Sequence, residues 1–87
     1  MYQVEFLPQA INDLRRLGQP IAQRVIKKVR WLAENLDSIK QEALAGPLTG
    51  LRKLRVGDYR VIYEPDPENR LITVHLIGHR RGVYRPS

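Results

Sequence analysis

The sequence contains no cysteine among its 87 residues. Without a thiol, the chain has no disulfide, no thiolate metal site and no cysteine nucleophile. No apolar run approaches the roughly 20 residues that a membrane-spanning helix needs. The N-terminus also lacks the basic and then apolar pattern of a secretory signal. We therefore expect a cytoplasmic protein.

The motifs of several enzyme classes are missing as well. The sequence has no G-x-G-x-x-G, no phosphate-binding P-loop and no evident Ser-His-Asp set. Its two histidines, His75 and His79, are four residues apart in or beside an expected strand, which is too far for one metal, and no third ligand lies near. The sequence therefore predicts neither a metal nor a cofactor.

Acidic residues are scarce relative to basic ones. The chain has 15 lysines and arginines against nine acidic residues, which gives a net charge of +6. Residues 1–45 contain seven basic and five acidic residues, and residues 46–87 contain eight and four. A balance this basic indicates an anionic partner such as nucleic acid, and the second half is the better place to look for its site.

The first half predicts one strand and two helices. Apolar residues alternate over residues 2–6, as in a half-buried strand. Helical spacing follows from Pro8 to Gly18, and a longer apolar stripe runs from Ile21 to Leu36. The opposite, polar side of this second helix includes Arg24, Lys27 and Lys28. We expect Arg24→Ala or Lys27→Ala to matter far less than loss of a cation of the second half. Residues 41–45 could form a helical turn.

The second half predicts three strands. Two lie within residues 51–63 and are joined by a tight turn at Gly57-Asp58. After a polar loop with two prolines, the β-forming run 71–77 supplies the third. We therefore expect a single domain over residues 1–87, of the α+β class. In the order β-α-α-β-β-β, an antiparallel sheet would carry a two-helix hairpin on one face.

The central hairpin concentrates positive charge. A two-residue turn pairs Arg55 with Arg60 and Lys53 with Ile62, so the three cations share one face. Leu54, Val56, Tyr59 and Val61 take the other face, which we expect to be core. Like charges opposite each other repel, and no carboxylate within the hairpin separates them. Two interpretations are open: a solvated outer face, or a phosphate site, which we favour.

A basic tail follows the last strand and adds one aromatic ring. Arginine binds phosphate through two N–H groups at once, and a tyrosine can stack on an unpaired base. RNA also brings its own nucleophile, the 2′-hydroxyl, so that a cationic site can cleave it without a metal or a protein nucleophile. The residues of this tail that suit a phosphodiester are His79, Arg80, Arg81, Tyr84 and Arg85.

Two segments carry a resemblance to a known family. Residues 54–63, LRVGDYRVIY, and residues 77–84, IGHRRGVY, together resemble the RelE-type toxins of the RelE/ParE toxin–antitoxin superfamily. The resemblance covers nearly the whole chain. It implies a ribosome-dependent endoribonuclease, or mRNA interferase, that cuts mRNA in the ribosomal A site and inhibits translation. The implied products have 2′,3′-cyclic phosphate and 5′-hydroxyl ends, and the implied partner is an acidic, RelB-like antitoxin in a heteromeric complex.

The resemblance also implies roles for individual residues. Catalytic roles fall on Lys53, Arg60, Arg80 and Tyr84, the last by stacking on a base. RNA-binding roles fall on Arg55, Arg81, Arg85 and His79, although His79 fits a structural role at a strand end equally well. The chain departs from some members at Leu51, where they carry a further basic residue. Two alternatives stay open: a ParE-type inhibitor of DNA gyrase, and a catalytically weak RNA-binding module.

Overall fold

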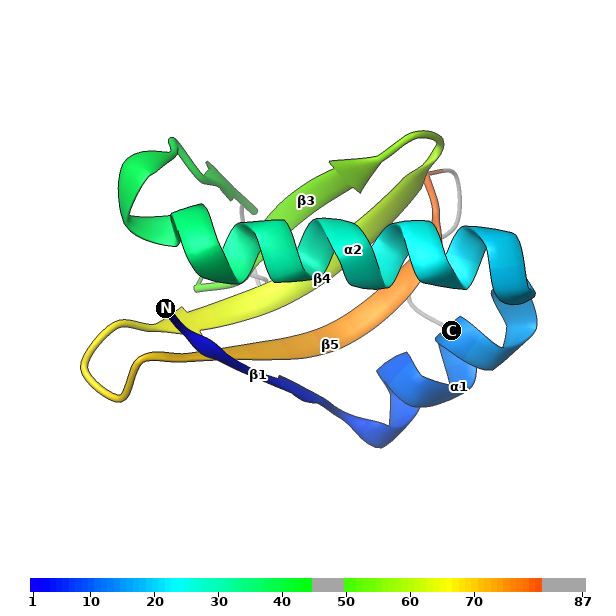
Figure 1. Cartoon of the computed structure of the whole chain (residues 1–87), viewed down its shortest axis with the longest axis horizontal. Coiled ribbons are helices and arrows are strands. Elements are labelled where there is room, and N and C mark those ends of the chain that lie inside the picture. The colour runs from blue at the N-terminus through cyan, green and yellow to red at the C-terminus, as the bar shows by residue number, and fades with distance from the viewer. Residues whose placement is uncertain (45–49, 81–87) are drawn as a thin grey trace.

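The computed structural model describes residues 1–44 and 50–80. In chain order the elements are β1 (Gln3–Phe6), α1 (Pro8–Leu17), α2 (Gln19–Asn35), the 3-10 helix η1 (Leu36–Ser38), β2 (Glu42–Ala43), β3 (Arg52–Val56), β4 (Tyr59–Asp66) and β5 (Leu71–His79) (Figure 1). Within the described ranges, no helix is long and apolar enough to cross a membrane. The predicted α+β class and both predicted helices are confirmed.

The sheet has the strand order β1-β5-β4-β3-β2. Strands β2 to β5 pair antiparallel, whereas β1 pairs with β5 in parallel. The sequence predicted an antiparallel sheet, and the parallel pair of β1 and β5 corrects that detail. It also allowed a helical turn over residues 41–45, but residues 42 and 43 form a strand, and residue 45 lies outside the described residues. A parallel pair needs a long crossover, which the two helices provide. Residues 42 and 43 form a short strand because the open edge of β3 offers them hydrogen-bond partners.

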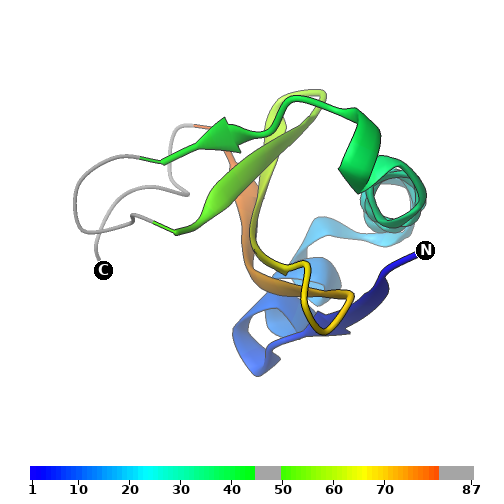
Figure 2. The same ribbon diagram turned by 90° about the vertical axis from the view of Figure 1, so that its left-hand side faces the viewer.

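Both helices pack on one side of a curved sheet (Figure 2). Pro8 stands at the start of α1, where its missing N–H is no loss, and Gly18 turns the chain into α2 with a φ of 78°. The core lies between α2 and the inner face of the sheet. Its fully enclosed members include Val25 and Leu32 from α2, and Val61, Ile72 and Val74 from the sheet.

A β-bulge adjusts the register between β4 and β5. Ile62 pairs with Leu76 and Tyr63 pairs with Val74, so His75 is the extra residue of β5. A bulge bends its strand and shifts which side chains face inward. As a result Val74 and Ile77, three residues apart, are both buried in the core.

The hairpin of β3 and β4 has the register that the sequence predicted, with Arg55 opposite Arg60 and Lys53 opposite Ile62. Leu54, Val56 and Val61 face the core as expected. Tyr59 does not: it is only half-buried, because it lies beside the turn, where its ring meets the His79 ring edge-on at 5.7 Å.

Gly57 carries the geometry of the turn. Its φ is 60°. Arg70 is the only described non-glycine residue with a positive φ, so Asp58, the second residue of the turn, has a negative one. This combination fits a type II′ turn. We expect Gly57→Ala to lower the free energy of unfolding by about 1–2 kcal/mol, because an L-residue is strained at this φ. Urea denaturation followed by circular dichroism measures the change.

Two controls separate backbone strain from crowding. Asp58→Ala should cost much less, since Asp58 has an ordinary φ. A Cβ at Gly57 would also lie 3.0 Å from Nη2 of Arg24. If Arg24→Ala removed the cost of Gly57→Ala, crowding by that side chain and not backbone strain would be its source.

Candidate nucleic-acid interface

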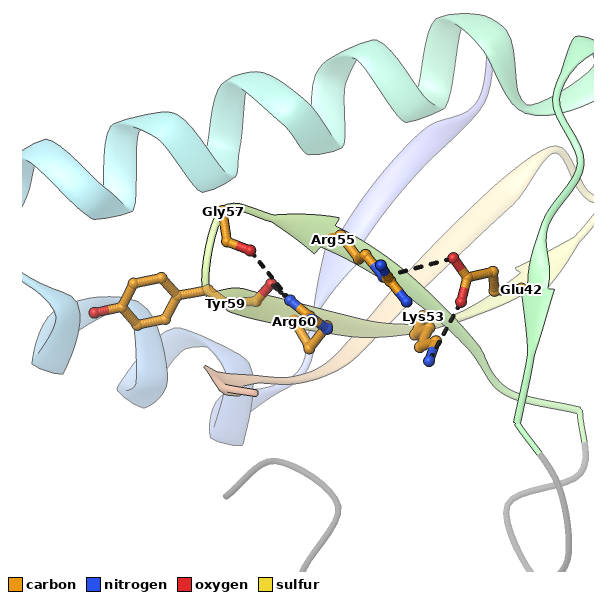
Figure 3. Close-up of polar contacts among 6 residues, drawn as sticks. All are labelled: Glu42, Lys53, Arg55, Gly57, Tyr59 and Arg60. Atoms are coloured by element: carbon orange, nitrogen blue, oxygen red, sulfur yellow. Dashed lines mark hydrogen bonds and ion pairs between the residues drawn. The ribbon is translucent and has the colours of Figure 1, made fainter. Parts of the chain in front are cut away.

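The cations of the hairpin come from two adjacent strands. β3 supplies Lys53 and Arg55, and β4 supplies Arg60 directly opposite Arg55 (Figure 3). The Arg55 side chain is 61% exposed and the Lys53 side chain 24%. The alternation of the strands therefore does turn these cations away from Leu54 and Val61, which lie in the core, as the sequence predicted.

A carboxylate from outside the hairpin joins this surface. Glu42 on β2 places its Oε2 3.3 Å from Nζ of Lys53 and its Oε1 3.7 Å from Nε of Arg55 (Figure 3). The sequence argument considered only carboxylates within the hairpin and missed this one. A strand of two residues has no periodicity from which its position could be read.

Arg60 bends back onto its own turn. Its Nη1 donates hydrogen bonds to the Gly57 carbonyl at 3.2 Å and to the Tyr59 carbonyl at 3.0 Å. These bonds fix the guanidinium near the tip of the hairpin (Figure 3). Arginine has five N–H donors, so donors on Nε and Nη2 remain for an anion.

Arg80 is attached to the same turn through its backbone. Its N–H donates to the Asp58 carbonyl at 2.8 Å, directly after β5 ends at His79. Both His79 and Arg80 are exposed. The structure thus gathers five predicted site residues around the hairpin, namely Lys53, Arg55, Arg60, His79 and Arg80. The other three, Arg81, Tyr84 and Arg85, lie outside the described residues.

Tyr63 supports the position of β2. It is buried, and its hydroxyl donates to Oε1 of Gln41 at 3.1 Å. Burial raises the pKa of Tyr63 to about 12, so the phenol is neutral and keeps its proton for this bond. Because Gln41 precedes Glu42, the bond helps to hold the carboxylate beside Lys53.

His75 belongs to a different contact. Its Nε2 lies 3.1 Å from Oε1 of Glu64 on the neighbouring strand. In the part of the chain that the structure describes, no three His, Cys, Asp or Glu residues gather closely enough to hold a metal ion. The contact of His75 joins β5 to β4, apart from the cations of the hairpin.

Known proteins resemble this chain over nearly its whole length. A family model described as "ParE toxin of type II toxin-antitoxin system, parDE" matches residues 4–84. A Mycobacterium tuberculosis protein named Toxin RelE is 32% identical over 84 residues, which cover 97% of this chain and 87% of that protein. This chain belongs to the RelE/ParE superfamily of type II toxins. Its likeness to the relative named Toxin RelE makes it a toxin of the RelE type.

Solved structures agree with this membership. The toxin–antitoxin complex RelBE2 from Mycobacterium tuberculosis contains a chain that matches with a TM-score of 0.81 and 28% identity, over 91% of this chain and 98% of that one. The isolated RelE toxin of Escherichia coli matches with a TM-score of 0.75 over 100% of this chain and 89% of that one. Its identity is 21%, so that likeness supports the RelE fold alone.

Proposed function

We propose that this RelE-type toxin is a ribosome-dependent endoribonuclease, which cuts mRNA in the A site of cytoplasmic ribosomes. One observation carries the proposal: Lys53, Arg55 and Arg60 lie on one tight hairpin, and the backbone of Arg80 is bonded to its turn. Three cations on the hairpin, with the backbone of a fourth bonded to its turn, suit a phosphodiester whose negative charge increases during reaction.

The reaction needs little covalent chemistry from the protein. The 2′-hydroxyl of the RNA passes its proton to water or to a basic side chain, its oxygen attacks the adjacent phosphorus, and the bond from phosphorus to the 5′-oxygen breaks. The departing 5′-oxygen gains a proton, which leaves a 2′,3′-cyclic phosphate and a 5′-hydroxyl. Arg60 and Arg80 would stabilise the phosphoryl oxygens, and Lys53 would act at the attacking or leaving oxygen. Tyr84 would stack on a base beside the cut.

Glu42 must give way when the phosphate binds. Its carboxylate contacts the same two cations, Lys53 and Arg55, that an RNA phosphate would contact. In the free toxin it reduces the repulsion between them. A phosphate that takes its place has to displace a half-exposed carboxylate, which costs little because exposed ion pairs are weak.

A ParE-type inhibitor of DNA gyrase is the second candidate. It is favoured by the description of the matching family model, which names ParE. The nuclease is favoured by the cationic residues of the hairpin and of the segment after β5, which the sequence matched to RelE-type toxins. An RNA-binding module with weak catalysis would keep the same cations but show no turnover.

We expect Lys53→Ala, Arg60→Ala and Arg80→Ala each to reduce cleavage about 10²–10³-fold, because each removes one charge from the reacting phosphate. In a purified translation system, mRNA should be cut within the A-site codon, with chelators present. A message with a single 2′-deoxynucleotide at the cut should resist. Primer extension maps the cut, and end-group analysis tests for the 2′,3′-cyclic phosphate and the 5′-hydroxyl.

The controls for this experiment use cations away from the hairpin. Arg15 and Arg16 lie in the last turn of α1, and their alanine variants should cleave normally. Equal losses in all variants would mean that net charge, and not a site, drives activity. Intact mRNA together with inhibited gyrase supercoiling would establish the ParE-type function instead.

Glu42→Gln should strengthen the binding of an uncleavable RNA by up to about fivefold, because the competing carboxylate is neutralised. Fluorescence anisotropy with a 2′-O-methyl oligonucleotide measures it. Glu5→Gln removes the same charge from an exposed position on β1, at the opposite edge of the sheet from β2, and is the matched control. Slower cleavage without tighter binding would show that the carboxylate takes part in the reaction.

We further propose an acidic, RelB-like antitoxin as the partner. The Mycobacterium and Escherichia coli RelBE neighbours are toxin–antitoxin complexes. Two surfaces of this toxin could receive such a chain. One is the helical hairpin, where Ile26 and Trp31 are 39% and 38% exposed, and the other is the sheet face with Arg55 and Arg60.

Co-expression of the neighbouring small open reading frame should relieve growth arrest, and its product should co-purify with the toxin. Association should slow as salt rises, because opposite charges steer the encounter. Growth assays and stopped-flow binding measure the two effects. A chain that is harmless alone and binds no neighbouring product would contradict this partner.

A further inference from the structure

A second cationic surface lies between α2 and the tip of the β3–β4 hairpin. It is a groove of about 490 Å³. Figures 1 and 3 show α2 passing alongside this end of the hairpin. The side chains and backbone that line it include Arg24, Lys27, Lys28, Trp31, Arg55 and Gly57.

The three cations of α2 are arranged on one side of the helix. Arg24, Lys27 and Lys28 follow the spacing i, i+3 and i+4, which makes their side chains neighbours. Across residues 1–44 and 50–80, no carboxylate forms a salt bridge with any of them. Neighbouring like charges without counterions destabilise a helix slightly, so this grouping favours an anionic ligand.

The hairpin turn allows the groove to close on one side. Nη2 of Arg24 lies 3.0 Å from the point where a Cβ of Gly57 would be. Because glycine has no side chain, the guanidinium can approach the turn. Arg24 thereby brings the charge of α2 up to the hairpin that carries the proposed cleavage site.

Lys28 also contacts Trp31, an aromatic ring that lines the groove. Nζ of Lys28 lies 3.8 Å from the centroid of the Trp31 ring, a cation–π contact. This contact occupies one face of the indole, so that face is closed to base stacking. The lining of the groove carries four cations, namely Arg24, Lys27, Lys28 and Arg55, and the part of RNA that matches them is its phosphate backbone.

Arg55 makes the groove continuous with the hairpin surface. It lines the groove and also shares Glu42 with Lys53. From these observations we infer that the groove binds the sugar–phosphate backbone of RNA, as an extension of the site at Lys53 and Arg60. The inference rests on the proposed function for the identity of the anion. An acidic peptide is the competing occupant.

The test compares two triple variants with equal charge. Arg24→Gln/Lys27→Gln/Lys28→Gln removes the groove cations. Arg15→Gln/Arg16→Gln/Arg30→Gln removes three cations that do not line it. Each is titrated with a 2′-O-methyl RNA oligonucleotide, which cannot be cleaved, over a range of salt. For the groove variant, the slope of log affinity against log salt should fall by about 2, and for the control it should change much less.

Trp31 is the sole tryptophan of the chain and reports occupancy of the groove directly. Its emission should change as the oligonucleotide binds the wild-type toxin, and should no longer change in the groove variant. Equal loss of affinity in both triple variants would overturn the inference in favour of net charge. Unchanged binding of both the oligonucleotide and the ribosome, with weaker antitoxin binding, would assign the groove to an acidic peptide and also overturn it.

A ribosome arm identifies the source of the RNA. If the groove variant fails to co-sediment with ribosomes lacking mRNA but binds the oligonucleotide normally, the backbone in the groove is ribosomal. If it loses the oligonucleotide as well, the groove takes single-stranded RNA such as the message. Either result supports the inference. Because the oligonucleotide is uncleavable, both remain readable even if the toxin proves not to be a nuclease.

Discussion

The two-residue turn at Gly57 and Asp58 is the constraint on which the rest of the site depends. A turn this short leaves no freedom in register, so Arg55 has to face Arg60 across the strands. The same register turns Leu54 and Val61 toward α2. Burial of the apolar side chains on one face therefore forces the positive charges together on the other. A shift in register would separate the charges but would also expose the apolar side chains.

The protein offsets the repulsion between these cations with a small number of polar contacts. Glu42 reaches Lys53 and Arg55 from a separate strand, and Arg60 donates to carbonyls of its own turn. These contacts are exposed or half-exposed, and such ion pairs contribute at most about 1 kcal/mol. They satisfy the cations in the free protein, yet they are weak enough for a phosphate to replace them.

The helix α2 serves two surfaces at once. Val25, Val29 and Leu32 on one side fill the core against the sheet. Arg24 and Lys28 on another side line the groove beside the hairpin. A rigid helix thus fixes the distance between the groove and the cations of β3. Within a RelE-type toxin, this arrangement lets the scaffold itself extend the cationic surface beyond the hairpin.

The sequence by itself determined the features that depend on near neighbours. The bounds of α1 follow from Pro8 and Gly18, and the register of β3 and β4 follows from the length of their turn. Five of the predicted site residues lie around the hairpin for the same reason, since they occur on it or directly after β5.

Only the tertiary structure decided which distant segments meet. It placed Glu42 beside Lys53, made β1 parallel to β5, and brought Arg24 to the turn at Gly57. It also left Tyr59 half-exposed against His79. Each of these contacts joins residues that are far apart in the sequence, so no local periodicity predicts it. They form because β3 has an open edge, the two helices cross over the sheet, and Gly57 has no side chain to keep Arg24 away. None of these causes can be read from the spacing of residues in the sequence.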